Sequence, residues 1–393
     1  MNTSQLRGDL PEPVRRYFLE VAQMQPPADL LDAAVAEIER TPRMNRFAAL
    51  PIFGFVAAAA VVIGLLVYTM MTPALPDVGD EPTPTVSPTA APTPVPIATL
   101  APIEGLPSAG SVVATYDPGG AGVPVLYAHG SVWLANVATG TLTRMDPDSG
   151  ELTGSIVVNP DPEHTRYDLN AVADDRWVWA TGLDNRLVKI DPQTNEIVER
   201  ILIETLVYRM VLRDGQIWIT DLDAGGHLIR VDATTSEIVA DERYPQWPAA
   251  LAVTDTDVWM APYQGDRLHR IDPATGQSLE VFPTSSFSMG IVAFDDALYL
   301  SGNQERPLER FSITEGTVTA RVPEMNAATD GDRLFGLRYV DGAFMELDPE
   351  TLQPRSATMI EGGETAIGLF GDGLFYVAQG ETNPRIVVID PSG

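Results

Sequence analysis

Apolar runs of five or six residues, each with an aromatic residue near its centre, recur through residues 111–393. Neighbouring runs lie about 40 residues apart, the period of the four-stranded blades of a β-propeller. The runs are apolar at consecutive positions, which favours strands that are buried on both faces. Seven aromatic positions therefore predict seven blades, and they are Trp133, Trp179, Trp218, Trp259, Tyr299, Phe335 and Tyr376.

A second pattern follows each aromatic run: a short apolar strand that ends in an aspartate turn. The clearest copies read LTRMDPDSG from Leu142, LVKIDPQTN from Leu187, LIRVDATTS from Leu228 and LHRIDPATG from Leu268, and the copy LERFSITEG from Leu308 is degenerate. Aspartate caps the backbone, proline presets φ, and glycine tolerates a positive φ, so this is turn chemistry. We interpret these aspartates as turn residues and the aromatic residues as core residues that pack between blades.

The two ends of residues 111–393 complement each other. The segment SVVATY from Ser111 resembles the outer strand of a blade, yet no first three strands precede it. The last residues supply an aromatic strand from Phe375 and a third strand, RIVVIDPSG, from Arg385, after which the chain stops. We predict that the N-terminal strand completes the last blade and closes the ring, which removes exposed sheet edges.

The first 71 residues have a different pattern. Residues 1–46 are polar with two short helical stripes, one through Val14, Tyr17, Phe18 and Val21 and one from Leu30 to Ile38. Residues 47–71 carry no charge and are long enough, at about 1.5 Å per residue, for a transmembrane helix. Arg40, Arg43 and Arg46 precede this run and the next basic residue is Arg144, so the positive-inside rule predicts a cytoplasmic N-terminus and an extracytoplasmic C-terminal part.

Residues 72–110 are dominated by proline, threonine, alanine and serine without hydrophobic periodicity. This composition is typical of an extended, disordered stalk. The predicted organisation is thus a cytoplasmic helical segment (1–46), a transmembrane helix (47–71), a proline-rich stalk (72–110) and an all-β, seven-bladed propeller (111–393). The protein is expected to be a single-pass protein of the cell membrane.

Charge and cysteine content narrow the function classes. The formal net charge of −29 excludes a nucleic-acid partner, because phosphate neutralisation needs an excess of lysine and arginine. Without cysteine the chain has neither disulfides nor thiolate chemistry. No nucleophile motif, zinc-ligand spacing, phosphate-binding glycine loop or calcium loop is present, so no catalytic or metal-ligating residues and no cofactor are predicted.

The succession VWLAN, then LTRMDPDSG, then a short strand resembles the YVTN-type and virginiamycin B lyase-like propeller repeats of bacteria, over residues 111–393. The resemblance implies a propeller that either binds a partner without chemistry or acts as a lyase with a divalent metal and a catalytic histidine. His129, His164, His227 and His269 occupy dissimilar places in the repeats, and we interpret His129, in a tight turn, and His269, within a strand, as structural. The layout of the whole chain, with the segment PADLLDAAVAEIERTPR before the span, also resembles membrane-bound anti-sigma factors.

By analogy with other propellers, a site is expected where loops converge over the central channel, on the face of the loops that lead into the innermost strands and follow the aromatic strands. Aromatic and charged side chains on these loops suit capture of a polar ligand or an exposed peptide. The candidate ligand-binding residues are His164, Tyr167, Asp168, Arg209, Trp247, Tyr263, Arg338 and Glu364.

Three hypotheses follow. The first is a membrane-anchored, extracytoplasmic propeller that binds a ligand or protein. The second is a metal-dependent lyase or hydrolase centred on the loop of His164, Tyr167 and Asp168, and the third is a transmembrane regulator whose residues 1–46 bind a cytoplasmic protein.

Overall fold

A computed structural model describes residues 95–159, 169–182, 185–203, 205, 207–221, 226–244, 247–263, 266–284, 290–302, 306–362, 365–380 and 384–393. The chain divides into two compact units, Met1–Val86 and Ser87–Gly393, and every described residue belongs to the second. The predicted cytoplasmic segment and transmembrane helix, and residues 72–94 of the predicted stalk, lie outside the described residues. Within the described ranges, no helix has both the length and the apolar character needed to cross a membrane.

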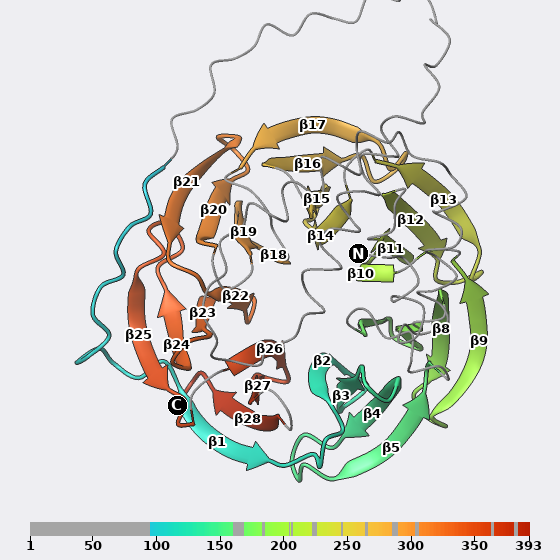
Figure 1. Cartoon of the computed structure of the whole chain (residues 1–393), viewed down its shortest axis with the longest axis horizontal. Coiled ribbons are helices and arrows are strands. Elements are labelled where there is room, and N and C mark those ends of the chain that lie inside the picture. Colours follow the sequence, from blue (N-terminus) through green and yellow to red (C-terminus); the bar gives the residue numbers. More distant parts are fainter. Residues whose placement is uncertain are drawn as a thin grey trace, which may run out of the picture. The chain divides into compact units, whose positions relative to one another are not determined.

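The described strands form seven four-stranded antiparallel sheets arranged around a ring (Figure 1). We number these sheets as blades I to VII. Blade I contains β2 (Val123–Ala128), β3 (Ser131–Asn136), β4 (Thr141–Met145) and β5 (Leu152–Val157). Blade II contains β6 (Ala171–Ala173), β7 (Val178–Gly182), β8 (Arg186–Asp191) and β9 (Glu196–Leu202). Blade III contains β10 (Val207–Arg213), β11 (Gln216–Asp221), β12 (His227–Asp232) and β13 (Ile238–Arg243). The seven-bladed all-β fold is thereby confirmed.

The remaining blades repeat this order from the channel outward. Blade IV contains β14 (Pro248–Val253), β15 (Val258–Pro262), β16 (Arg267–Ile271) and β17 (Ser278–Pro283). Blade V contains β18 (Gly290–Phe294), β19 (Ala297–Ser301), β20 (Leu308–Ser312) and β21 (Thr317–Val322). Blade VI contains β22 (Asn326–Thr329), β23 (Leu334–Arg338), β24 (Ala343–Leu347) and β25 (Pro354–Met359). Blade VII contains β26 (Thr365–Gly371), β27 (Leu374–Gln379), β28 (Arg385–Asp390) and β1 (Ser111–Tyr116).

Blade VII is built from both ends of residues 111–393, as the sequence predicts. Strand β1 pairs antiparallel with β28, from Ser111 opposite Asp390 to Tyr116 opposite Ile386. The hydroxyl of Tyr116 also donates to the backbone oxygen of Pro147 at 3.1 Å, in the aspartate turn of blade I. The N-terminal strand therefore completes its own blade and contacts the next one around the ring.

The aromatic column lies in the core between blades. All seven of its side chains are at most 1% exposed, which confirms the packing role expected from the sequence. Each one packs within apolar clusters that join neighbouring blades; Trp133, for example, contacts residues of both blade I and blade II. Burial of this much apolar area is the main stabilising contribution of such a core.

The aspartate turns have the predicted chemistry. In blade I the carboxylate of Asp146 accepts the amides of Asp148 and Ser149 at 3.1 and 2.9 Å, and Gly150 closes the turn with a φ of 72°. These hydrogen bonds hold the pKa of Asp146 below its ordinary value. In the degenerate fifth copy, the hydroxyl of Ser312 takes the place of the carboxylate and accepts the amide of Glu315 at 3.2 Å.

A basic residue two positions before the turn aspartate links blades. Its side chain lies beside the aromatic column and, in blades I to III, donates to the turn of the following blade. In blade III the guanidinium of Arg230 lies 5.1 Å from the Trp218 ring, and Nη1 donates to the backbone oxygens of Pro273 and Ala274 at 2.9 and 3.0 Å. The residues at this position in blades I to V are Arg144, Lys189, Arg230, Arg270 and Arg310.

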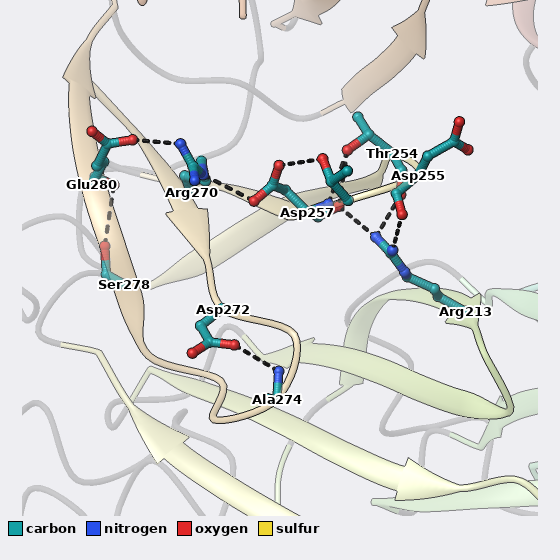
Figure 2. A network of polar contacts seen from close by, with 10 residues as sticks. Arg213, Thr254, Asp255, Asp257, Arg270, Asp272, Ala274, Ser278 and Glu280 are labelled. Carbon is teal, nitrogen blue, oxygen red and sulfur yellow. Dashed lines mark hydrogen bonds and ion pairs between the residues drawn. The ribbon is translucent and has the colours of Figure 1, made fainter.

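Blades III and IV share a second arginine contact, from the end of β10 to the turn between β14 and β15 (Figure 2). Arg213, at the end of β10, donates to the backbone oxygens of Thr254 and Asp257 at 2.5 and 2.9 Å. Figure 2 also shows Arg270 between the carboxylates of Asp257 and Glu280, at 2.9 and 2.7 Å, within blade IV.

Residues 95–110, the last part of the predicted stalk, run along the outer edges of blades V and VI (Figure 1). We call this segment the strap. The amide of Ala98 donates to the backbone oxygen of Arg321 on β21 at 2.8 Å, and the oxygen of Pro107 accepts the amide of Ala357 on β25 at 2.8 Å. Leu100 and Ile103 pack on the cluster between these two blades. The strap thus covers two sheet edges that would otherwise be exposed.

Candidate functional site

A cavity of about 450 Å³ lies in the central channel, and the described residues that line it come from every blade except IV. The lining positions are mostly the first residues of the innermost strands and the last residues of the second strands. They therefore lie toward the face on which the sequence places its candidate loops. The described lining residues are Val123, Pro124, Val125, Ala135, Val137, Leu169, Asn170, Arg209, Gly290, Ile291, Val292, Ser301, Gly302, Asn326, Ala327, Gly368 and Leu369.

Arg209 is the candidate residue that lines this cavity. It lies on β10, where its guanidinium Cζ is 4.5 Å from the centre of the Tyr208 ring. Its Nη1 donates to Oδ1 of Asn170 and to the backbone oxygen of Tyr208, both at 3.4 Å. The amide nitrogen of Asn170 donates to the same Tyr208 oxygen at 2.6 Å, so blades II and III jointly orient the two side chains.

Trp247 and Tyr263 also meet, on blade IV. Trp247 precedes the innermost strand β14, and Tyr263 follows the aromatic strand β15. Their ring centres are 6.3 Å apart, and the amide of Tyr263 donates to the backbone oxygen of Trp247 at 2.6 Å. Trp247 is 38% exposed, so this aromatic pair is in part accessible to solvent. Neither residue lines the cavity.

Arg338 pairs with a carboxylate of its own blade. It ends β23, and its guanidinium forms a bidentate pair with Asp341, at 2.8 and 2.5 Å, across the turn to β24. The side-chain hydrogen bonds to this carboxylate, followed by smaller charge effects that include Glu104 of the strap, raise the pKa of Arg338. In the described residues Arg338 thus orders a turn and lies outside the cavity lining.

The other four candidates, His164, Tyr167, Asp168 and Glu364, lie outside the described residues. Their grouping into a binding site stays a prediction. The described histidines have structural environments. His129 adopts a φ of 53° in the turn between β2 and β3, and His227 Nδ1 lies 2.6 Å from Asp241 Oδ1. Burial, reinforced by Arg267, lowers the pKa of His269.

Three polar residues of the cavity were not identified as candidates from the sequence: Asn170, Ser301 and Asn326. The two asparagines share a recognisable signal, because each stands directly before a run of small residues at the start of an innermost strand, as NAVA from Asn170 and NAAT from Asn326. No group of three or more histidine, aspartate or glutamate side chains suited to a metal occurs among the described residues.

Two further hollows lie away from the channel. One, of about 480 Å³, lies between the connection from β1 to β2 and the outer strands of blade I. Its described lining residues are uncharged and include Asn136, Thr141 and Ser155. The other, of about 370 Å³, lies between blades VI and VII and contains Gln379 and Arg385. None of the four described candidate residues lines either one.

No protein-family model and no curated protein matches the chain. Solved structures are similar in fold. A streptogramin B lyase superposes with a TM-score of 0.55 at 16% identity, over 70% of this chain and 95% of that one. BamB from Moraxella catarrhalis gives a TM-score of 0.50 at 15% identity, over 69% and 85% of the two chains. The propeller domain of Cps50 (Swd1) from Myceliophteria thermophila gives 0.55 at 12% identity, over 72% and 99%. At these identities the likeness establishes the propeller fold, and the virginiamycin B lyase-like resemblance of the sequence holds at the level of that fold.

Proposed function

We propose that this chain is a membrane-anchored, extracytoplasmic propeller that binds a ligand in its central cavity. The observation that carries the proposal is the cavity itself, about 450 Å³ of mainly apolar lining with a few polar groups, to which six blades contribute. This size and composition are those of small-molecule sites. The anchor is proposed from the uncharged run 47–71 and the arginines that precede it.

The Trp247–Tyr263 pair adds a second contact surface on blade IV. A partly exposed tryptophan beside a tyrosine is typical of surfaces that bind peptides or proteins, because both rings supply contact area at low entropic cost. We propose that the ligand is a polar molecule or an exposed peptide. One part of it lies in the cavity, and another part lies over the Trp247–Tyr263 pair.

The enzyme and regulator hypotheses stay predictions. The metal-dependent lyase or hydrolase is centred on His164, Tyr167 and Asp168, and the regulator on residues 1–46, all outside the described residues. The streptogramin B lyase structure supports the propeller fold and carries no residue correspondence at 16% identity. Binding therefore remains the function with direct support from described residues.

Thermal shift on the full chain in detergent tests the proposal, with panels of metals, peptides, glycans and organic acids. A ligand at 100 times its Kd stabilises the folded state by about 2.7 kcal/mol, which for a domain of this size corresponds to roughly 5 °C. The variant Ala327→Phe narrows the cavity, whereas Val340→Phe adds the same ring at a position that is 64% exposed. We expect the first to abolish the shift and the second to preserve it. A shift that survives Ala327→Phe would place the ligand elsewhere.

A further inference from the structure

We propose that a hollow beside blade I binds a neutral glycan through hydroxyl groups. This is the hollow of about 480 Å³ between the connection from β1 to β2 and the outer strands of blade I, and we call it the blade I hollow. Its volume lies in the range of small-molecule sites. It shares no described lining residue with the channel cavity, so the inference goes beyond the proposed function and does not depend on it.

Blade I differs from the other blades at the positions that line this hollow. Thr143 on β4 and Ser155 on β5 are cross-strand partners, and Thr141 lies two residues before Thr143 on the same face of the sheet. Among the described blades, blade I alone has hydroxyl side chains on both residues of this pair. The corresponding pairs of blades II to VII are Val188 with Arg200, Ile229 with Asp241, His269 with Val281, Glu309 with Arg321, Met345 with Ala357 and Val387 with Thr115.

The place of Thr141 shows a similar departure from the repeat. The residues at this place in blades II to VII are Arg186, His227, Arg267, Pro307, Ala343 and Arg385, so a basic side chain is the usual occupant. In blade VII this side chain lines the corresponding hollow, where Arg385 donates to Gln379 Oε1 at 2.9 Å. Blade I has an uncharged hydroxyl there instead. Positions at which one repeat departs from the others are candidates for function rather than architecture.

The walls of the blade I hollow are held in place by Asn136 at the end of β3. Its Nδ2 donates to the backbone oxygen of Gly120 in the connection at 2.5 Å, and its Oδ1 accepts the amide of Thr139 at 3.1 Å. Blade VII makes the equivalent tie with Gln379, whose Nε2 donates to the backbone oxygen of Glu361 at 3.0 Å. The tie is therefore part of the repeat, and it leaves a preformed hollow that needs less ordering when a ligand binds.

The hydroxyls of the hollow form two pairs. The Oγ1 atoms of Thr139 and Thr141 are 2.8 Å apart, and Thr143 Oγ1 lies 3.0 Å from Ser155 Oγ. Each pair contains two hydroxyl hydrogens and uses one of them, and these four hydroxyls have no other hydrogen-bond partner among the described residues. One hydrogen of each pair is thus left to donate to a ligand. Because Thr141 and Thr143 are two residues apart on one strand, the two pairs are separated by about 7 Å, and a ligand with several oxygens can contact both.

The rest of the lining favours a neutral ligand with apolar surface between its polar groups. The described lining residues are uncharged, so a charged ligand group would lose water without gaining a counter-charge from them. Pro118 and Leu152, which is 43% exposed, supply apolar contact area. A sugar combines C–H faces with hydroxyls, which both donate and accept and therefore match the hydroxyls of the protein in either direction. A peptide backbone has separate donors and acceptors and must fit in one register.

Ligand-observed NMR titration of the full chain, in a detergent without a sugar head group, measures the Kd of each probe. The neutral glycans are maltotriose, cellotriose and triacetylchitotriose, and acetylated triglycine amide is a neutral peptide without hydroxyls. Two or more hydrogen bonds to sugar hydroxyls lead us to expect that at least one glycan binds at least about tenfold more tightly than the peptide.

Variants assign the binding to this hollow. Thr141→Val and Ser155→Ala each remove one hydroxyl, and each should weaken glycan binding about fivefold. Thr141→Arg introduces the side chain that blades II, IV and VII carry at this place, so it should abolish binding without lowering the Tm. Thr153→Val is the matched control, because Thr153 is exposed on β5 between two lining residues and does not line the hollow itself; its affinity should equal that of the wild type.

Three results would overturn the inference: no binding of any of the three glycans, equal affinity of the peptide and the tightest glycan, or glycan binding that persists in Thr141→Arg. The test also separates this site from the channel cavity. Glycan binding that persists in Thr141→Arg and disappears in Ala327→Phe would place the glycan in the channel, which supports the proposed function and refutes the blade I hollow as its site.

Discussion

Replacement of Arg230 by methionine tests whether the arginine contacts between blades stabilise the ring. Arg230 is 9% exposed, and its Nη1 donates to the two backbone oxygens of Pro273 and Ala274 in the next blade. Methionine keeps most of the length that packs on Trp218, so the change removes mainly the charge and the hydrogen bonds. Its effect on the free energy of unfolding therefore measures the contact between blades III and IV.

The magnitude follows from opposing contributions. Two hydrogen bonds from a charged donor contribute about 1.5 kcal/mol each at the lower limit, and the contact with the Trp218 ring, at 5.1 Å, adds about 1 kcal/mol. Against this, Nε of Arg230 is buried with no hydrogen-bond partner among the described residues, which costs about 1–2 kcal/mol. The balance predicts that Arg230→Met destabilises the folded state by about 2 kcal/mol.

Thermal unfolding followed by tryptophan fluorescence measures this balance. All six tryptophans of the chain lie between residues 133 and 259, so the signal reports the propeller alone. For a domain of this size, about 2 kcal/mol lowers the Tm by roughly 4 °C. Arg243→Met, on the exposed face of β13, should change the Tm by less than about 1 °C. An unchanged or higher Tm for Arg230→Met would show that desolvation of the buried guanidinium outweighs its contacts, as occurs for some buried ion pairs.

Four further predictions concern other parts of the ring. Lys189 is the single lysine of the chain and is 7% exposed, so acetic anhydride should modify it only after unfolding, as read by mass spectrometry; fast modification of the native protein would contradict its burial. The amide of Thr351 and then Arg355 lower the pKa of Asp348 to about 2, so its stabilising effect should be complete above about pH 4 and lost as pH falls through about 2. Asp348→Asn should weaken this dependence of the Tm on acidic pH. If the Tm of the variant depends on pH as that of the wild type does, other groups cause the dependence. Tyr116→Phe should destabilise by about 1 kcal/mol through loss of its hydrogen bonds to the turn of blade I, measured against wild type in urea. Leu100→Asp should release the strap and raise thermolysin cleavage within residues 95–110, and resistance equal to wild type would show that backbone contacts alone hold it.

Much of the ring could be predicted from the sequence because its repeats are local. An aromatic residue at a fixed place in each repeat, and an aspartate turn after it, specify strands and turns without reference to distant residues. Trp133 and Asp146 therefore have the environments expected of them. The closure of blade VII also followed from the repeat, since β1 and β28 are two parts of one unit.

The strap was not foreseen because its contacts are not local. Residues 95–110 contain no periodic apolar pattern, and their composition continues that of the preceding proline-rich segment. Only the outer edges of β21 and β25, more than 200 residues later, provide partners for the backbone of Ala98 and Pro107. The basic residue that links blades was visible in the sequence as the Arg or Lys two positions before the turn aspartate, but its partner lies in the following repeat.

The candidate ligand-binding residues stay a prediction, and the structure shows where the described ones lie. The expected face is the one toward which the cavity lies, and Arg209 lines it. Trp247 and Tyr263 meet because one precedes and the other follows adjacent strands of one blade. Arg338 was selected by residue type and loop position, which do not reveal that Asp341, three residues later, pairs with it.

The pairing of β1 with β28 has a consequence for biosynthesis. The ribosome makes β1 first among the described strands of the ring, and its partner β28, at residues 385–390, is the last of these strands to be made. Six blades can form as they emerge, but the seventh must wait until β28 has been made, with the outer strand β1 unpaired in the interval. A chain that lacks β28 would therefore keep an open ring, in which β1 is unpaired and one edge of β27 is left without its partner strand.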